Sequence, residues 1–287
     1  EGIVICSGCR NYASVNGKGY KAGGICGGFS QIGSFENCIN YADVHALKQA
    51  GGIVGFCGSN KIESGDYIFT ACGNEGNIST DKDTAAGIAA YAYGNDKHAA
   101  KINACYSTGN VTAGCEAGGI LGYFNGTSAT EIKNCFVTGT VKTTDSSMKS
   151  CVFFWCKYAD PMAPGNISGN FYLPGCADAE KYEGGAYSEL SANITADDVK
   201  SGKLAYMLNA AVGSEVFYQN IGSDEFPVAD SSHKSVKLVD GKYINEAAPD
   251  KPDNPPTGDT AAAVAVCAVL MLGTAAVVAV GKKRIAD

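Results

Sequence analysis

The sequence predicts an all-β protein: a parallel β-helix, or β-solenoid, of about five coils, followed by a small α+β cap and a C-terminal transmembrane helix. Three observations predict this fold. A cysteine-centred pattern recurs through the first half of the chain, the segments between its members are rich in turn formers, and the chain ends in a long uncharged run. Internal repeats of about 20 to 50 residues are typical of solenoids, propellers and arrays.

Each repeat begins with a cysteine that is followed six residues later by Val or Ile, as in CINYADV, CGNEGNI and CYSTGNV. A Gly-Ile pair follows after nine or ten more residues in the first four repeats. Successive cysteines are 29, 34, 33 and 30 residues apart, so the register is kept over five copies. The pairs are Cys9/Val15, Cys38/Val44, Cys72/Ile78, Cys105/Val111 and Cys135/Val141, and the isoleucines are Ile25, Ile53, Ile88 and Ile120.

Each unit offers three short β-prone patches separated by Gly, Asn and Asp, which predicts three strands per coil over residues 1–172. No patch has the ten or more residues with a period of 3.6 that a helical repeat needs. A propeller blade is longer, at about 40 residues with four strands. In a solenoid, equivalent strands stack about 4.8 Å apart. The isoleucines, the Val/Ile residues and the cysteines are therefore each expected to form an inward column, with the cysteines packing as small hydrophobes.

The Gly-Ile-x-Gly cores of the repeats resemble the GLUG motif of bacterial surface proteins. Three copies match it, at Gly24–Gly27, Gly52–Gly55 and Gly119–Gly122, and the copy at Gly87–Ala90 departs from it. The resemblance covers roughly the first half of the chain. It implies a surface location and a β-helical shape, and it implies no chemistry.

Residues 173–244 are expected to form a capping module. Thr195 to Val212 has the pattern of a helix, with Thr195 as N-cap, acidic residues in the first turn and Gly202 dividing it into two pieces. The last coil of a solenoid has an unpaired edge, and a helix over that edge prevents aggregation. We therefore expect the helix to cover the end of the last coil.

The remaining chain divides into a Pro-rich spacer over 245–259, an uncharged segment over 260–280 and a basic tail over 281–287. The uncharged segment has 21 residues. As a helix it would be about 32 Å long, enough to cross the hydrocarbon core of a bilayer. The basic tail is expected to stay in the cytoplasm.

Immediately before the uncharged segment stand Asn254, Pro255, Pro256, Thr257 and Gly258. This motif, with the apolar segment and basic tail after it, resembles the cell-wall sorting signal of Gram-positive surface proteins, with Asn254 in place of the usual Leu. The resemblance implies that a sortase attacks the carbonyl of Thr257 and joins it to peptidoglycan. The protein would then be extracellular and wall-anchored, and held in the membrane by 260–280 before sorting. The alternative is a plain membrane anchor that no sortase cuts.

Composition argues against a nucleic-acid partner, because the net charge is −7 and the only arginines are Arg10 and Arg284. No catalytic residue, cofactor or metal ligand is predicted. Cys6 and Cys9 form a CxxC, but the chain has no second CxxC to complete a zinc site. The histidines share no motif spacing with a nucleophile or a carboxylate.

The predicted function is that of a non-enzymatic adhesin, stalk or glycan-binding surface, with host or dietary glycans or host surface proteins as partners. Phe56, Tyr91 and Tyr123 each follow a repeat isoleucine by three residues, so they are expected to point outward and contact glycans. The alternative for these rings is that they cover the corner of a coil.

The alternative function is a tethered polysaccharide lyase or glycosidase. Such an enzyme needs paired carboxylates, whereas the acidic residues of the repeats are scattered in sequence. They include Glu63, Asp66, Glu75, Asp81, Asp83, Glu116 and Glu131.

Overall fold

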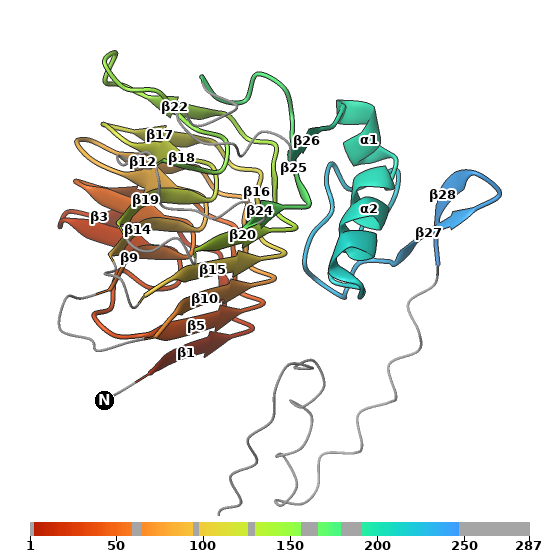
Figure 1. Cartoon of the computed structure of the whole chain (residues 1–287), viewed down its shortest axis with the longest axis horizontal. Helices are drawn as coiled ribbons and strands as arrows, with labels where there is room; N and C mark the ends of the chain where they lie inside the picture. Colours follow the sequence, from red (N-terminus) through yellow and green to blue (C-terminus); the bar gives the residue numbers. More distant parts are fainter. Residues whose placement is uncertain are drawn as a thin grey trace, which may run out of the picture. The chain divides into compact units, whose positions relative to one another are not determined.

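The computed structural model describes residues 3–58, 65–93, 98–125, 130–155, 166–178 and 191–246. They belong to the first of two units, Glu1–Ala248. This part of the chain is predominantly β-structure and winds into a solenoid of parallel sheets (Figure 1). It also contains two short helices, α1 (Ala196–Lys200) and α2 (Lys203–Val212). The all-β, solenoidal class predicted from the repeats is confirmed.

Five parallel sheets, here named A to E, run along the solenoid. Sheet A joins β1 (Val4–Ser7), β5 (Gly33–Glu36), β10 (Tyr67–Thr70), β15 (Ala100–Asn103), β20 (Glu131–Lys133) and β24 (Ile167–Ser168). Sheet B joins β2 (Arg10–Asn11), β6 (Ile39–Asn40), β11 (Gly73–Asn74), β16 (Tyr106–Ser107), β21 (Phe136–Val137), β25 (Asn170–Tyr172) and β26 (Ser191–Asn193). Sheet C joins β3 (Val15–Gly17), β7 (Val44–Ala46), β12 (Ile78–Thr80), β17 (Val111–Ala113) and β22 (Val141–Thr143).

Sheets D and E complete each turn. Sheet D joins β4 (Lys21–Gly23), β8 (Gln49–Gly51), β13 (Ala85–Ala86) and β18 (Ala117–Gly118). Sheet E joins β9 (Val54–Gly58), β14 (Ala89–Tyr93), β19 (Leu121–Asn125) and β23 (Phe154–Trp155). Because sheets D and E have four strands each, the described chain makes about four turns, slightly fewer than the five expected.

A full turn therefore contains five short strands, and the prediction of three strands per coil is wrong. One reason is a backbone corner that divides the extended segment around each column cysteine into a strand of sheet A and a strand of sheet B. The residue before each column cysteine adopts a left-handed conformation, which separates sheet A from sheet B. These residues are Gly8 (φ 65°), Asn37 (49°), Ala71 (52°), Ala104 (53°) and Asn134 (55°). A left-handed residue ends a strand, because its backbone no longer continues the extended direction.

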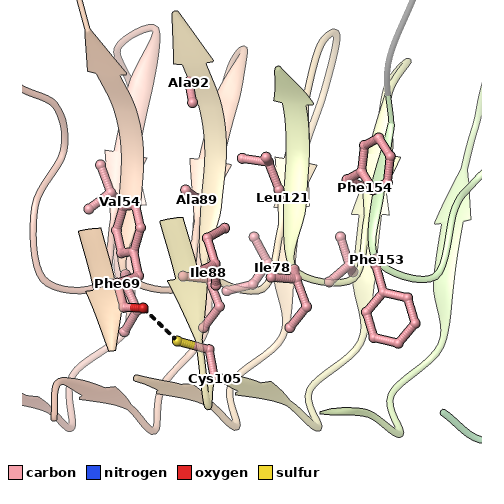
Figure 2. Packing of buried hydrophobic residues seen from close by; sticks show 14 of the residues in the cluster. Val54, Phe69, Ile78, Ile88, Ala89, Ala92, Cys105, Leu121, Phe153 and Phe154 are labelled. Atoms are coloured by element: carbon pink, nitrogen blue, oxygen red, sulfur yellow. Dashed lines mark hydrogen bonds between the residues drawn. The ribbon is translucent and has the colours of Figure 1, made fainter. Parts of the chain in front are cut away.

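The three inward columns are confirmed. In sheet C, Val15 pairs with Val44, Val44 with Ile78, Ile78 with Val111 and Val111 with Val141. The isoleucine column is held by backbone hydrogen bonds from each coil to the next, such as Ile53 N to Ile88 O (3.0 Å) and Ile88 N to Ile120 O (3.0 Å). Figure 2 shows Ile88 in the core beside a further column of Val54, Ala89, Leu121 and Phe154.

The cysteine column also lies in register. Cys38, Cys72, Cys105 and Cys135 are buried, and the backbone N–H of Cys72 donates to the Sγ of Cys105 at 3.4 Å. The five cysteines of the column, Cys9, Cys38, Cys72, Cys105 and Cys135, form no disulfide. Burial raises the pKa values of the Cys72 and Cys105 thiols well above their ordinary range, so these thiols stay protonated. They act as packing residues, as the repeat predicted.

Polar side chains inside the solenoid form a ladder of hydrogen bonds from coil to coil, which explains why Asn or Ser recurs at one position of the repeat. The Asn11 side chain donates to Asn40 Oδ1 (2.7 Å), Asn40 to Asn74 Oδ1 (2.8 Å), and Asn74 to Ser107 Oγ (3.4 Å). Asn40, Asn74 and Ser107 are fully buried. The polar position two residues after the cysteine thus satisfies buried hydrogen-bonding groups from coil to coil.

A second ladder runs along the outside of the turn before sheet C. Asp43 Oδ1 accepts from the backbone of Asn77 (2.8 Å), Asn77 Oδ1 from that of Asn110 (3.2 Å), and Asn110 Oδ1 from that of Thr140 (3.0 Å). These residues directly precede the Val/Ile column. These polar residues recur in the sequence for the same reason as the cysteines: equivalent positions of successive coils stack on one another.

The C-terminal part of the described chain, here called the C-terminal module, comprises residues 191–246. Its β26 extends sheet B next to β25, and β27 (Val236–Val239) and β28 (Lys242–Asn245) form an antiparallel hairpin. Thr195 caps α1 in a capping box with Asp198, and Gly202, at φ 86°, separates α1 from α2, as the sequence predicts.

The position of the helices differs from the expectation that they cover the end of the last coil. A cluster of buried side chains joins α2 to the outer face of sheet B: Tyr106, Phe136 and Phe171 on the sheet pack with Leu204, Leu208 and Phe217 of the module. The Tyr106 and Phe136 rings stack at 5.3 Å, and Phe217 meets Phe136 edge-on at 5.7 Å. The helices lie on this flank because its outward residues are aromatic and need cover.

No helix within the described ranges is long and apolar enough to cross a membrane. The predicted span over 260–280, the basic tail over 281–287 and the sorting motif from Asn254 to Gly258 lie outside the described residues. The same holds for the spacer over 245–259, apart from Asn245 and Glu246.

Candidate functional site

Three aromatic residues form a continuous stack on the outside of sheet E. Phe56 on β9, Tyr91 on β14 and Tyr123 on β19 are partners in the strand register. The ring centroids of Phe56 and Tyr91 are 5.5 Å apart and those of Tyr91 and Tyr123 are 4.7 Å apart, each pair with planes 21° from parallel. All three rings are half-buried. We call these three residues the aromatic stripe.

The stripe follows directly from the solenoid register. Strands one coil apart are about 4.8 Å apart, which is close to the spacing of stacked rings, so aromatic residues at one position stack along the sheet. The backbone register also pairs Tyr123 with Trp155 on β23. The inward neighbours of the stripe, Cys57 and Phe124, belong to the core. The predicted outward orientation of the rings thus agrees with their partial exposure.

A lysine side chain lies over the ring at one end of the stripe. The Nζ atom of Lys21, on β4 of the first coil, lies 3.2 Å from the centroid of the Phe56 ring. Partial burial lowers the pKa of Lys21. An ammonium group over a ring face is attracted by the negative potential of the π-system.

Two carboxyl groups lie near the central ring of the stripe, Tyr91. Glu116 Oε2 accepts a hydrogen bond from Thr84 Oγ1 at 3.0 Å, and Asp83 precedes Thr84 in the neighbouring coil. Burial raises the pKa of Glu116, and the charge of Asp83 raises it further. The pKa of Tyr91 rises to about 12, chiefly through burial, with Tyr123, Asp83 and Glu116 among the neighbours that add to it. The stripe therefore has carboxyl groups on its flank.

The sequence suggested that Asp83 and Glu116 are scattered, but the coil register brings them together. Thr84 and Glu116 each stand four residues before a repeat isoleucine, so they occupy the same position in successive coils. This shared offset was the signal that would have found the contact. Asp83 joins the pair because it directly precedes Thr84, whose hydroxyl lies 3.4 Å from Asp83 Oδ1.

A second group of ionisable side chains lies where sheet B meets the C-terminal module. Arg10 Nη2 is 4.0 Å from Asp230 Oδ2, and His233 Nδ1 is 2.7 Å from Asp224 Oδ2. Glu75 Oε1 accepts from the hydroxyl of Tyr106 at 3.0 Å. Sequence spacing gave no signal for this group, because its members come from the first three coils and from residues more than a hundred positions later.

Within the described ranges, no three or more His, Cys, Asp or Glu side chains are arranged to hold a metal ion. The chemistry that these two groups of residues support is stacking and hydrogen bonding. Both are typical of the recognition of flat or ring-shaped polar molecules.

Comparison of the chain with protein-family models and with curated proteins finds no match, and comparison with solved structures finds none either.

Proposed function

We propose that this chain is a cell-surface, wall-anchored repeat protein whose β-solenoid presents the aromatic stripe as a glycan-binding surface, without catalysing a reaction. The observation that carries the proposal is the stack of Phe56, Tyr91 and Tyr123, which lines up three half-buried aromatic rings along one flank of the solenoid with their edges outward. Binding sites for small polar molecules combine such apolar faces with a few polar groups that fix orientation.

The side chains around the stripe suit sugars. A pyranose ring has C–H groups on its faces, which pack on an aromatic ring, and hydroxyl groups on its edge, which need hydrogen-bond partners. Glu116, which accepts a hydrogen bond from the buried Thr84, supplies a carboxyl group near Tyr91. A glycan lying along the stripe would therefore meet the outer edges of the three rings below it and a carboxyl group at its side. Host or dietary glycans are the partners of this kind.

The surface location in this proposal rests on two resemblances in the sequence. The Gly-Ile-x-Gly cores are similar to the GLUG motif, and Asn254 to Gly258 with the segments after it are similar to a sorting signal. On this basis a sortase would link Thr257 to peptidoglycan in a Gram-positive bacterium, and residues 260–280 would hold the chain in the membrane until then. The solenoid would stand outside the wall as a stalk or adhesive surface.

Replacing Tyr91 by Ala is expected to weaken glycan binding at least tenfold, or about 1.4 kcal/mol, because it removes the central ring of the stripe. The measurement is calorimetric titration with a panel of maltohexaose, cellohexaose, xylohexaose and chitohexaose. Tyr20→Ala is the matched control, since Tyr20 is 62% exposed and lies outside the stripe. Equal affinities of the Tyr91→Ala variant and the unaltered protein would refute the stripe as the binding surface.

Replacing Thr257 by Ala is expected to abolish covalent attachment to the cell wall, because the acyl bond to peptidoglycan would be made at this residue. The measurement is the amount of protein released from purified walls by muramidase in a Gram-positive host that exports the full chain. Lys200→Ala, an exposed position in α1 far from the motif in sequence, serves as the control for expression. Undiminished wall linkage of the Thr257→Ala variant would leave only a membrane anchor.

The alternative function is a tethered glycan-degrading enzyme, and one observation favours it. Glu116 has a raised pKa next to the carboxylate of Asp83, and glycosidases use a protonated and an ionised carboxyl group in this way. If the unaltered protein released shorter sugars from the same hexasaccharide panel and Glu116→Gln did not, the enzyme would replace the binding protein as the conclusion.

A further inference from the structure

The outside of sheet D carries a row of polar side chains. One alanine in each strand of sheet D belongs to the core, so the residue before it faces outward. The alanines pair from coil to coil, as Ala85 does with Ala50 and with Ala117, so the outward residues are also in register. We call the following four outward residues the polar row: Lys21, Gln49, Thr84 and Glu116.

The polar row lies against the aromatic stripe, with an offset of one coil. Lys21 Nζ in the first coil lies 3.2 Å from the centroid of the Phe56 ring in the second coil. Thr84 in the third coil approaches the fourth, because a Cβ atom added to Gly122 would lie 2.4 Å from the Cγ2 atom of Thr84. Gly122 directly precedes Tyr123. Each residue of the polar row thus lies beside the stripe residue of the following coil.

The same offset places Gln49 of the second coil beside Tyr91, the central ring of the stripe. The backbones agree with this placement. A Cβ atom added to Gly51, on the same face of β8 as Gln49, would lie 3.0 Å from the backbone nitrogen of Ala90, which precedes Tyr91. Because β8 is paired with β4 on one side and with β13 on the other, Gln49 has a neighbouring strand of sheet D on both sides.

Gln49 is the member of the polar row whose amide oxygen has no use within the fold. Thr84 donates to Glu116 at 3.0 Å, and the ammonium group of Lys21 lies over the Phe56 ring. By contrast, Gln49 Oε1 is buried and meets no hydrogen-bond donor among the residues that the structure describes. A buried acceptor without a partner costs about 1 to 3 kcal/mol. Such an atom calls for an explanation, and a ligand that supplies the donor is one.

A primary amide matches two hydroxyl groups on neighbouring carbon atoms. Its oxygen accepts from one hydroxyl group while its nitrogen donates to the other. When the side chain of Gln49 turns outward beside Tyr91, a glycan can use both atoms in this way, and binding recovers the cost of the buried oxygen. Glucans and xylans have such pairs of free hydroxyl groups, whereas an N-acetylhexosamine has an acetamido group in place of one of them.

We propose that Gln49 is a specificity-determining residue of the aromatic stripe and selects glycans with free adjacent hydroxyl groups over N-acetylated glycans. This inference rests on the proposed binding of glycans at the stripe and names the class of glycan. The stripe supplies the apolar contact with the sugar, and Gln49 reads the hydroxyl groups beside its central ring.

The test is calorimetric titration of the full chain with cellohexaose, maltohexaose and xylohexaose, which have the hydroxyl pair, and with chitohexaose, which lacks it. We expect at least one of the first three to bind about fivefold or more tightly than chitohexaose, the effect of one or two hydrogen bonds. Gln49→Met keeps the length of the side chain without its hydrogen bonds, and is expected to remove this preference. Gln31→Met, the same substitution at an exposed residue outside sheet D, is expected to leave it unchanged.

The melting temperature of Gln49→Met separates recognition from a structural role. The substitution replaces a buried acceptor that has no partner by an apolar group, so the variant is expected to be at least as stable as the unaltered protein while it binds the glycan more weakly. A variant that loses stability and affinity together would give Gln49 a structural role and would overturn the proposal.

The outcomes also separate this proposal from that of the stripe. If Tyr91→Ala weakens binding but chitohexaose binds as tightly as the other probes, or Gln49→Met leaves every affinity unaltered, the role of Gln49 is wrong and the stripe stands. If no hexasaccharide binds, or Tyr91→Ala has no effect, the stripe is wrong and the role of Gln49 falls with it.

Discussion

Replacing Ile88 by Ala is expected to lower the free energy of unfolding by about 2 to 5 kcal/mol, the cost of truncating a fully buried isoleucine. Ile88 is buried completely in the middle of its column, between Ile53 and Ile120. Its neighbours in the core are held by strands that pair on both sides, so they have little freedom to close the cavity (Figure 2). The measurement is chemical denaturation followed by circular dichroism.

Ile68→Ala is the matched control for this prediction. Ile68 lies in a central strand of sheet A, as Ile88 lies in a central coil, but its side chain is 37% exposed. The Ile68→Ala substitution should lower the free energy of unfolding by at least about 1 kcal/mol less than Ile88→Ala does, because it removes less buried apolar surface. Equal losses for the two variants would mean that Ile88 does not point inward.

Replacing Asn74 by Leu is expected to destabilise the protein by about 2 to 4 kcal/mol, although Leu is apolar and similar in size. Asn74 links two coils, because it accepts from Asn40 at 2.8 Å and donates to the backbone of Gly76 at 2.9 Å. Leu would remove the acceptor of one N–H of the Asn40 amide, whose other N–H donates to Ala42 O, and the side-chain donor to the Gly76 carbonyl. Each lost partner of a buried group costs about 1 to 3 kcal/mol. Urea denaturation measures the effect.

The outer ladder provides the control for Asn74. Asn77→Leu also removes a side chain that joins neighbouring coils, but Asn77 is exposed, so the groups it leaves can bind water. We expect a loss below about 1 kcal/mol. If the two substitutions had the same effect, the inner ladder would not be sealed from water.

The columns of the solenoid were predictable because stacking imposes the same residue type at the same position of each coil. Ile88, Val111 and Cys105 could be placed from their spacing alone. The division of each coil into five strands was not predictable, since its corners fall at residues such as Ala71 and Ala104. These residues have a left-handed backbone but are alanines, so the sequence lacks the glycine that would indicate this conformation.

Of the candidate functional residues, some could likewise be predicted from the sequence and others could not. Phe56, Tyr91 and Tyr123 could be found from their common offset to the isoleucines, and the structure stacks them. The contact of Arg10 with Asp230 could not be found, because it joins the first coil to the C-terminal module and follows no repeat. The sequence did contain one overlooked signal for where the module packs.

That signal is the residue after the column cysteine. It faces outward in sheet B, and it is aromatic in two later coils, as Tyr106 and Phe136. Large apolar residues on an outward face require cover, which predicts that another part of the chain lies on this flank. The position of α2 against sheet B follows from this pattern.

The central claim is that the recurring residues stack in columns inside the solenoid, and the most direct test is alkylation of the native protein with iodoacetamide, followed by mass spectrometry of each cysteine. Cys72 and Cys105 are fully buried, whereas Cys26 in the first coil is half-exposed. For a core protected by at least about 5 kcal/mol, the two buried thiols should react roughly a thousandfold more slowly than Cys26. Similar rates at all three cysteines would contradict the columns and the fold built on them.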